Sequence, residues 1–175
     1  MKNILFKKMA ILAIAAVTMS VAVNAQTKGD MAAGGNLVIG MGDEFTNVGI
    51  GAKFQYNILD PLRLEGSFTF FLPKSEYGVK QSMWDLSVNA HYLFPVADQI
   101  TVYPLAGLGI LGVKAKADLG DFGTISASDS FFGFNIGGGV DFKLSETIIL
   151  NAEMKYKIGD VWNRFLISAG VAFKF

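Results

Sequence analysis

The side chains that could carry acid–base chemistry are few, and the search starts from the single histidine, His91. Ser87 and Asp85 precede His91 by four and six residues, so a serine hydrolase with His91 as its base is one hypothesis. In a strand the three side chains would share one face. However, at about 3.3 Å per residue, Ser87 would lie roughly 13 Å from His91, which is beyond hydrogen-bond reach. We therefore predict no catalytic residues, and we expect His91 to be a hydrogen-bonded interior side chain.

The sequence also gives little support for a metal or cofactor site. The chain has no cysteine, and one histidine leaves mainly carboxylates as ligands. The acids of Asp118-Leu119-Gly120-Asp121 are better explained as a solvated loop than as a calcium site. Gly137-Gly138-Gly139 lacks the lysine and the serine or threonine that follow the glycines of a phosphate-binding loop. We predict no metal and no cofactor, and interpret the three glycines as a tightly packed strand.

The elements that must position these residues are strands, because the dominant hydrophobic period is two. In 148–159, leucine, alanine, methionine, tyrosine and isoleucine occupy even positions, while asparagine, glutamate and lysine occupy odd ones. No segment has a convincing helical period. Eight segments are predicted as strands: 30–42, 47–58, 62–70, 84–94, 100–115, 132–143, 148–159 and 163–175.

The connections between these strands alternate in length. Short turns are predicted at 59–61, 95–99 and 145–147, and the opposite end carries 43–46, 73–80, 116–128 and 160–162. Among the connections, 73–80 and 116–128 are the longest. This alternation favours an up-and-down meander in which each strand pairs with its neighbours in sequence.

The first 25 residues have the layout of a cleavable signal peptide. Three lysines precede an apolar core from Met9 to Val23, and Ala25 and Gln26 flank the predicted cleavage site. We divide the chain into a signal at 1–25 and one barrel domain at 26–175. Because the signal takes three of the 15 Lys and Arg residues and no acid, 12 basic and 15 acidic residues remain, a net charge of −3. Nothing in this charge favours a nucleic-acid partner.

Two opposite barrels share this alternation, one with the apolar face inside and one with it outside, against lipid. The predicted strands are long enough to cross a bilayer, and the polar face is rich in glycine, asparagine and serine. Aromatic residues fall at two heights with aliphatic residues between them, as in the girdles of a membrane barrel. The polar face then lines a lumen in which both charge signs can pair. The predicted lumenal network is Lys53, Arg63, Glu65, Asp85, His91, Asp141, Lys143, Glu153, Lys155 and Lys157.

In lipid every backbone polar group must be paired, so the sheet must close. Residues 163–175 are therefore predicted to pair with 148–159 on one side and with 30–42 on the other. The predicted fold is all-β, an eight-stranded antiparallel up-and-down transmembrane β-barrel.

A signal, eight alternating strands and an ending Phe173-Lys174-Phe175 resemble the small outer-membrane β-barrel proteins of Gram-negative bacteria. This is the OmpA-, OmpX- and OmpW-like group, also called porin-family proteins. The resemblance covers 26–175 and implies a bacterial outer-membrane location, with outer-membrane lipids and the assembly machinery as partners. It also implies that Ala169, Val171, Phe173 and Phe175 form the assembly signal. Unlike full-length OmpA, the sequence has nothing after Phe175, and we expect no peptidoglycan-binding domain.

Function remains open between two main hypotheses. If the lumenal charges interlock, the barrel is closed and has a structural or surface-interaction role, with an extracellular partner bound through 73–80 and 116–128. If the inward glycines leave a water path, the barrel is a narrow pore for ions or small solutes. We favour the closed barrel, because eight strands enclose a space that side chains can fill. A lipid-modifying outer-membrane enzyme built on His91 is the third and least favoured hypothesis.

Overall fold

The computed structural model describes residues 27–42, 46–76, 79–118, 124–159 and 163–175. The predicted signal at 1–25 and its cleavage site at Ala25 and Gln26 lie outside these ranges. Within them, no helix is long and apolar enough to cross a membrane. The strands are β1 (Met31–Met41), β2 (Thr46–Leu59), β3 (Leu62–Glu76), β4 (Val79–Tyr92), β5 (Phe94–Ala97), β6 (Ile100–Asp118), β7 (Thr124–Lys143), β8 (Ile148–Gly159) and β9 (Arg164–Lys174).

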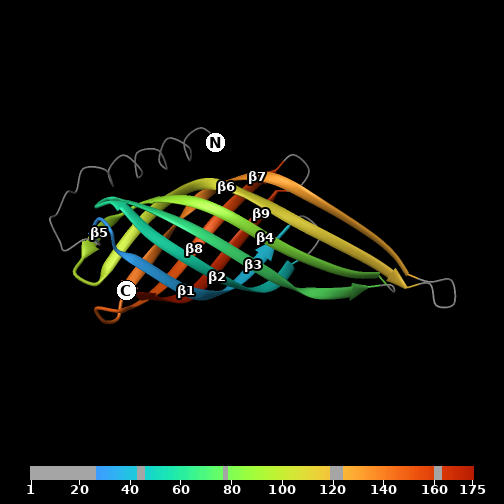
Figure 1. The fold of residues 1–175 in the computed structure, drawn as a ribbon, viewed down its shortest axis with the longest axis horizontal. Coiled ribbons are helices and arrows are strands. Elements are labelled where there is room, and N and C mark those ends of the chain that lie inside the picture. Colours follow the sequence, from blue (N-terminus) through green and yellow to red (C-terminus); the bar gives the residue numbers. More distant parts are fainter. Residues whose placement is uncertain (1–26, 43–45, 77–78, 119–123, 160–162) are drawn as a thin grey trace, which may run out of the picture.

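These strands form one antiparallel sheet that closes on itself (Figure 1). Each strand pairs with its neighbours in sequence, and β5 continues the line of β4 after Leu93, so that both pair with β6. The wall therefore has eight strand positions. β9 pairs with β8 and with β1, which closes the barrel at the predicted seam. The predicted eight-stranded antiparallel barrel is confirmed.

The closing seam between β1 and β9 brings the two backbones close together. Gly34 lies opposite Ala172, and Gly170 lies opposite Asn36. A Cβ at Gly34 would collide with the carbonyl oxygen of Val171, so the seam accepts no side chain there. Small residues therefore allow the first and last strands to pair in this register.

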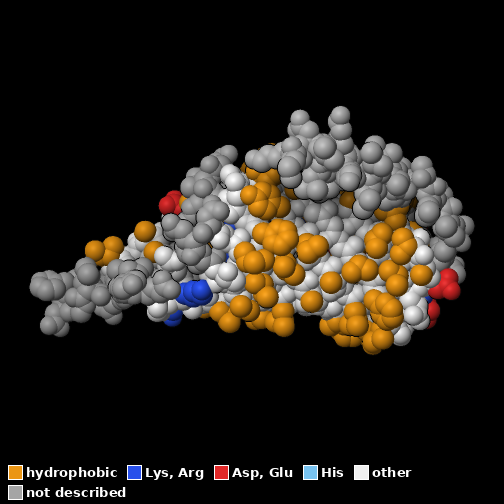
Figure 2. Space-filling view, turned by 180° about the vertical axis from the view of Figure 1, so that it is seen from behind, with side chains coloured by type: hydrophobic (Ala, Val, Ile, Leu, Met, Phe, Trp, Pro, Cys, Tyr) orange, Lys and Arg blue, Asp and Glu red, His pale blue; other side chains and the backbone are white. Residues whose placement is uncertain are grey.

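The two faces of the wall differ as the period of two predicts. Along β8 buried and exposed residues alternate, so that Asn151 and Glu153 point inward while Leu150 and Met154 are exposed. Large apolar side chains cover much of the outer surface, and in Figure 2 they gather in two zones. An exposed apolar surface of this extent needs lipid rather than water around it.

The outward aromatic residues lie at two levels along the strands. Near the short turns, Tyr92 lies opposite Leu62, and its ring is 4.8 Å from that of Phe94. Near the other end, Trp84 lies opposite Phe70, and its ring centroid is 6.2 Å from that of Phe68. Aliphatic residues and glycine occupy much of the wall between them, as in the aromatic girdles of membrane barrels.

The segments 73–80 and 116–128 differ from their prediction as loops. Strand pairing continues through most of both, with Lys74 opposite Gln81 and Lys116 opposite Ser126. As a result the β3–β4 and β6–β7 hairpins, which pair with each other up to Val79 and Ala117, project together beyond the other strands (Figure 1). Above a membrane the outward face meets water, so lysine on β6 and serine on β7 occupy the parity that is apolar in the membrane-spanning part, and the pattern no longer indicates a lipid-facing strand.

Candidate functional site

The barrel interior collects most of the predicted lumenal charges. Eight of the ten predicted residues are buried: Lys53, Arg63, Glu65, Asp85, His91, Asp141, Glu153 and Lys157. The Lys155 side chain is 12% exposed and lies 3.5 Å from Glu153. Lys143 is different, because it is the last residue of β7; its side chain is 39% exposed and pairs with Glu146 outside the lumen.

Arg63 is the second residue of β3, near the end of the barrel that carries the short turns, and it is fully buried. Its Nη1 lies 2.6 Å from the carboxylate of Asp141 on β7, on a distant part of the wall. Its Nε and Nη2 lie 3.3 and 3.0 Å from Nδ1 of His91. Since a guanidinium can only donate, Nδ1 accepts and the histidine proton is on Nε2. The ring of Tyr103 stacks on His91 at 4.5 Å and lies 4.8 Å from the Arg63 guanidinium carbon.

A second group of charges lies next to this one. Lys53 on β2 donates to Asn151 on β8 at 2.7 Å and lies 3.7 Å from Glu65. Gln55 donates to the same Glu65 carboxylate at 2.8 Å. Each of these side chains is buried, so their hydrogen bonds join β2, β3 and β8 through the lumen.

Glu65, His91 and Glu153 are the side chains that come nearest to a metal-ligand set in the described part of the chain. Their ligand atoms lie within 4.8 Å of one another. However, Lys53 already lies 3.7 Å from Glu65, and Lys155 lies 3.5 Å from Glu153. These lysines balance both carboxylates, so the charge of this cluster requires no cation.

The residues of the hydrolase hypothesis have separate partners. Ser87 donates to Asp85 at 2.6 Å, and Lys157 on β8 also donates to Asp85 and contacts Ser87 at 3.4 Å. His91 is engaged by Arg63 and Tyr103 instead. The described geometry thus contains no hydrogen bond between Ser87 and His91, in agreement with the distance expected along one strand.

Apolar side chains occupy both ends of the polar interior. At the end near the short turns, Leu93, Tyr103 and Leu105 form a buried cluster. At the other end a second cluster consists of Val38, Phe71, Met83 and Leu166, with Val113 packed against it. The guanidinium carbon of Arg164 lies 4.6 Å from the Phe71 ring centre and closes the polar interior beneath this cluster.

Little space is left inside. A cavity lined by Asn36, Glu65, Asp85, Lys155 and Ser168 has a volume of about 10 Å³. One water molecule needs about that much. This cavity therefore has room for about one water molecule.

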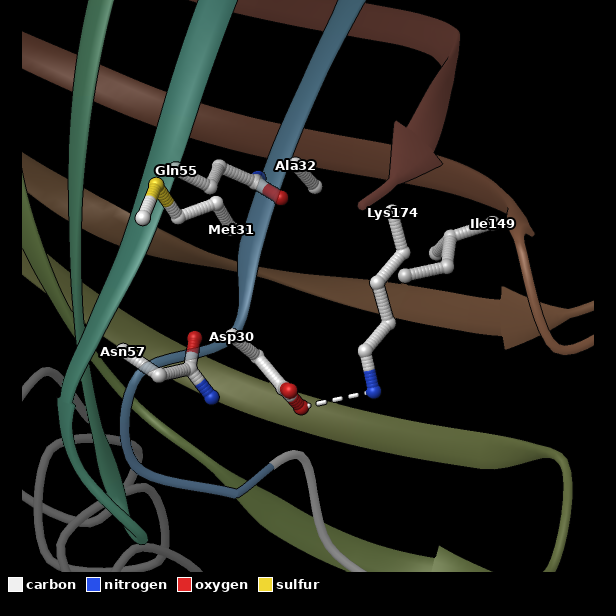
Figure 3. A pocket seen from close by; sticks show the side chains of 7 residues that line it. All are labelled: Asp30, Met31, Ala32, Gln55, Asn57, Ile149 and Lys174. Atoms are coloured by element: carbon white, nitrogen blue, oxygen red, sulfur yellow. Dashed lines mark ion pairs between the residues drawn. The ribbon is translucent and has the colours of Figure 1, made fainter.

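A shallow pocket lies at the rim where β1 begins (Figure 3). There the Lys174 ammonium lies 2.7 Å from the Asp30 carboxylate. Partial burial opposes ionisation of Asp30, but hydrogen bonds from Lys174 and Thr27 outweigh it and hold the Asp30 pKa below its ordinary value. This pair fastens the chain preceding β1 to the last residue of β9.

Several interior residues were missed by the sequence prediction. Tyr103 and Arg164 are buried: the Tyr103 ring lies against the Arg63 guanidinium, and Arg164 donates to Asn47 at 3.3 Å. Asn135 donates to Asn89 at 2.9 Å. These residues lie on the inward parity of their strands. A prediction based on parity alone, with uncharged polar residues included, would have found them.

The residues of the implied assembly signal lie on the outer surface of β9 and its end. Phe173 is 53% exposed and Phe175 is 72% exposed. The Phe175 ring lies 6.5 Å from that of Phe54, and its N–H donates to the Met31 carbonyl at 3.0 Å. The last residue is therefore still paired with β1 and faces outward.

Comparison with known proteins agrees with this geometry. Residues 9–175 match the family model described as outer membrane protein beta-barrel domain. No curated protein matches the chain. Among solved structures, Ail, the attachment invasion locus protein of Yersinia pestis, has a TM-score of 0.63 at 20% identity, covering 85% of this chain and 100% of Ail.

Two further solved structures have the same fold. Neisserial surface protein A has a TM-score of 0.63 at 17% identity, covering 83% of this chain and 96% of that protein. The N-terminal barrel domain of Pseudomonas aeruginosa OprF has a TM-score of 0.60 at 16% identity, covering 86% of this chain and 100% of that domain. At these identities the likeness is one of fold.

Proposed function

Because this chain belongs to the outer membrane protein beta-barrel domain family, we propose that it is a closed barrel with a structural and surface-interaction role. The bacterial outer membrane is its location. In this proposal the wall faces lipid, the lumen is filled by side chains, and contacts with partners are made by the projecting hairpins. The narrow pore is the alternative.

The observation that carries the closed barrel is the Arg63–Asp141 pair. The two residues come from β3 and β7, which are not neighbours in the wall, and their charged atoms are 2.6 Å apart. Lys157 with Asp85 spans β8 and β4 in the same way at another level. An ion crossing the lumen would have to separate buried charge pairs, and breaking such a pair costs about 3–5 kcal/mol.

The apolar clusters at both ends add a second barrier. A hydrophobic constriction excludes water and so opposes ion passage even where its radius would allow an ion. The interior cavity of about 10 Å³ is also too small for a hydrated ion. Both features favour a filled lumen over a water path.

Conductance in a planar bilayer tests this proposal. We expect no steady current from the native barrel at 100 mV. Arg63→Gln and Glu153→Gln, which remove interior charges, are compared with Lys143→Gln, which removes an exposed one. Steady native current that changes with the two interior variants, and not with Lys143→Gln, would support the pore instead.

Surface contact is supported by the hairpins. The β3–β4 and β6–β7 hairpins extend past the level of Trp84, and the β6–β7 hairpin projects furthest (Figure 1). Ail, which shares the fold, has been solved in complex with the heparin analogue sucrose octasulfate. We propose that the hairpins of this chain likewise bind a partner outside the cell.

We also propose that the protein is not an enzyme. The hydrolase hypothesis needs Ser87 bonded to His91, but Ser87 donates to Asp85 and His91 is bound by Arg63. The test is lipid hydrolysis by the folded barrel in mixed micelles. Activity lost in both His91→Ala and Ser87→Ala, with folding intact, would overturn this part of the proposal.

The last strand is proposed to carry the assembly signal through Ala169, Val171, Phe173 and Phe175. Its support is the exposed, lipid-facing position of Phe175 at the rim. Deleting Phe175 should reduce insertion into cells' outer membranes more than it lowers the stability of barrel refolded in detergent. Equal insertion of the native and deleted chains would contradict this role.

A further inference from the structure

Three lysines share the outer face of the projecting sheet. Lys80 on β4 lies directly opposite Lys116 on β6, and Lys114 lies two residues nearer the barrel. All three are exposed. Residues directly opposite in an antiparallel sheet have their Cβ atoms about 4.5–5.5 Å apart on the same face. The three ammonium groups therefore gather on one surface, which we call the lysine patch.

Serines surround this patch. Ser75 on β3 lies opposite Lys80, and Ser126 on β7 lies opposite Lys116. Lys114 lies between Ser82 and Ser128. The face thus presents two rows across neighbouring strands: in one row a pair of lysines is flanked by serines, and in the other a single lysine lies between two serines. Both groups donate hydrogen bonds, and phosphate oxygens accept them.

No acid pairs with the patch among the residues whose side chains are described; Asp118 of β6, opposite Thr124, follows Lys116 by two residues nearer the tip. The three lysines form no ion pair with the described side chains, and Asp129 of β7 lies opposite Val113, on the other face. Like charges directly opposite one another destabilise a sheet. Since Lys80 and Lys116 are nevertheless paired, an anion between them would remove an existing repulsion.

Trp84 of the aromatic girdle gives a reference for the height of the patch relative to the membrane. Trp84 is two residues below Ser82 and four below Lys80 on β4, and its indole lies against Gly112 of β6. Two and four residues correspond to about 7 and 13 Å along a strand. With a strand tilt near 40°, this is about 5 and 10 Å above the aromatic girdle.

The polar headgroup layer of a bilayer is about 5–8 Å thick on each side. Lys114 therefore lies at the level of the headgroups. Lys80 and Lys116 lie just above that level, and their long side chains can reach down to it. Figure 2 shows Lys or Arg side chains at the base of the projection, beside the edge of the apolar zone. A soluble ligand would have to reach the patch from the aqueous side, whereas lipid headgroups are already present at the depth of the patch. This favours a lipid as the ligand.

We propose that Lys80, Lys114 and Lys116, with Ser82 and Ser128, bind the phosphate groups of a phosphorylated lipid in the outer leaflet. The acyl chains of this lipid lie against Trp84 and the apolar wall beneath it. This inference deepens the proposed surface-interaction role and names the partner of one of its surfaces. The lysine patch is outside the lumen. A negative result for lipid binding would therefore leave the closed-barrel proposal unaffected.

The test uses the full folded barrel in phosphatidylcholine nanodiscs that contain increasing fractions of lipid A, a glycolipid with two phosphates. A Trp162→Phe background leaves Trp84 as the only tryptophan, and its fluorescence reports the binding. Replacing the three patch lysines by glutamine should raise the half-saturating fraction of lipid A about one hundredfold, because each lysine near an anionic surface contributes about 1 kcal/mol. Replacing all three by arginine should preserve binding.

The control is Lys28→Gln, Lys74→Gln and Lys143→Gln together, which removes the same charge from two exposed lysines and from one whose side chain is 39% exposed. Lys74 is on the same projection but lies opposite Gln81, on its other face. The control should bind lipid A like the native protein. Equal weakening in both triple variants, or none in the patch variant, would overturn the proposal.

A second arm separates lipid from a soluble anion. Sucrose octasulfate is titrated into discs that lack lipid A. If the patch variant loses octasulfate binding while its response to lipid A equals that of the native protein, the patch serves a soluble polyanion and the lipid assignment is wrong. Loss of the lipid A response alone supports the lipid.

Discussion

Replacing Arg63 by glutamine should destabilise the barrel more than any single change at its surface charges. Arg63 is fully buried, and its guanidinium serves Asp141, His91 and the Tyr103 ring at once. Glutamine is shorter and neutral. It would leave the Asp141 carboxylate inside the barrel without its cation and His91 Nδ1 without a donor.

The size of the effect follows from this burial. Removing one partner of a buried ion pair costs about 3–5 kcal/mol, because the remaining charge stays desolvated. The free energy of unfolding of Arg63→Gln should fall by that amount. An exposed pair contributes about 0–1 kcal/mol. Lys143, paired with Glu146 through side chains that are 39% and 88% exposed, supplies the matched control Lys143→Gln.

The assay is reversible urea unfolding of barrel folded in lipid vesicles, followed by tryptophan fluorescence. Asp141→Asn and the double variant complete a thermodynamic cycle. The double variant should lose less than the sum of the two single losses, because it leaves no lone charge. If Arg63→Gln and Lys143→Gln destabilise equally, or if the cycle is additive, the interior pairs do not hold the lumen closed.

Three further predictions concern other parts of the barrel. Ala152→Lys places a charge in mid-wall against lipid and should cost about 2–4 kcal/mol in urea unfolding, whereas Lys155→Arg in the lumen, which keeps a cation beside Glu153, should cost clearly less; equal losses would contradict the assignment of the two faces. Gly34→Ala should destabilise by about 1–3 kcal/mol through overpacking at the seam, while Gly66→Ala, with open space around its Cβ, should be nearly neutral. Asp30 has a lowered pKa when folded, so its contribution is present at neutral pH and lost as the pH falls below about 4; native stability should drop there relative to Asp30→Asn, and parallel pH curves would contradict this.

The wall of the barrel could be predicted from sequence because two solvents act on alternate residues. Along β8 the even residues face lipid and most odd residues face the lumen. Apolar and polar residue types therefore alternate along the sequence. Closure then followed from the need to pair every backbone group in lipid. The same reasoning stopped short above the membrane, because β6 runs on to Asp118 and β7 begins at Thr124, beyond the predicted strands 100–115 and 132–143.

The interior could be predicted as a set of residues but not as a set of pairs. Parity placed Arg63 and Asp141 in the lumen, yet nothing in the sequence says that they meet, because β3 and β7 lie far apart in the chain. Which residues pair depends on the height that each residue reaches, and this is set by the register of every strand between them. Lys143 has the parity of the lumenal residues, but it is the last residue of β7 and its side chain pairs with Glu146 outside the lumen.

The seam between β1 and β9 determines how the barrel can close during insertion and whether it can open again within the membrane. These strands are the most distant in the sequence, so their pairing carries the largest loop-closure entropy and is expected to form last. Before it forms, two rows of unpaired N–H and C=O groups would face hydrocarbon, at several kcal/mol each. An open form therefore has no stable place in the membrane, and insertion and closure must be one cooperative event. Once the barrel is closed, no gap between strands opens toward the lipid. Any molecule that enters the interior must therefore pass the apolar cluster at one end.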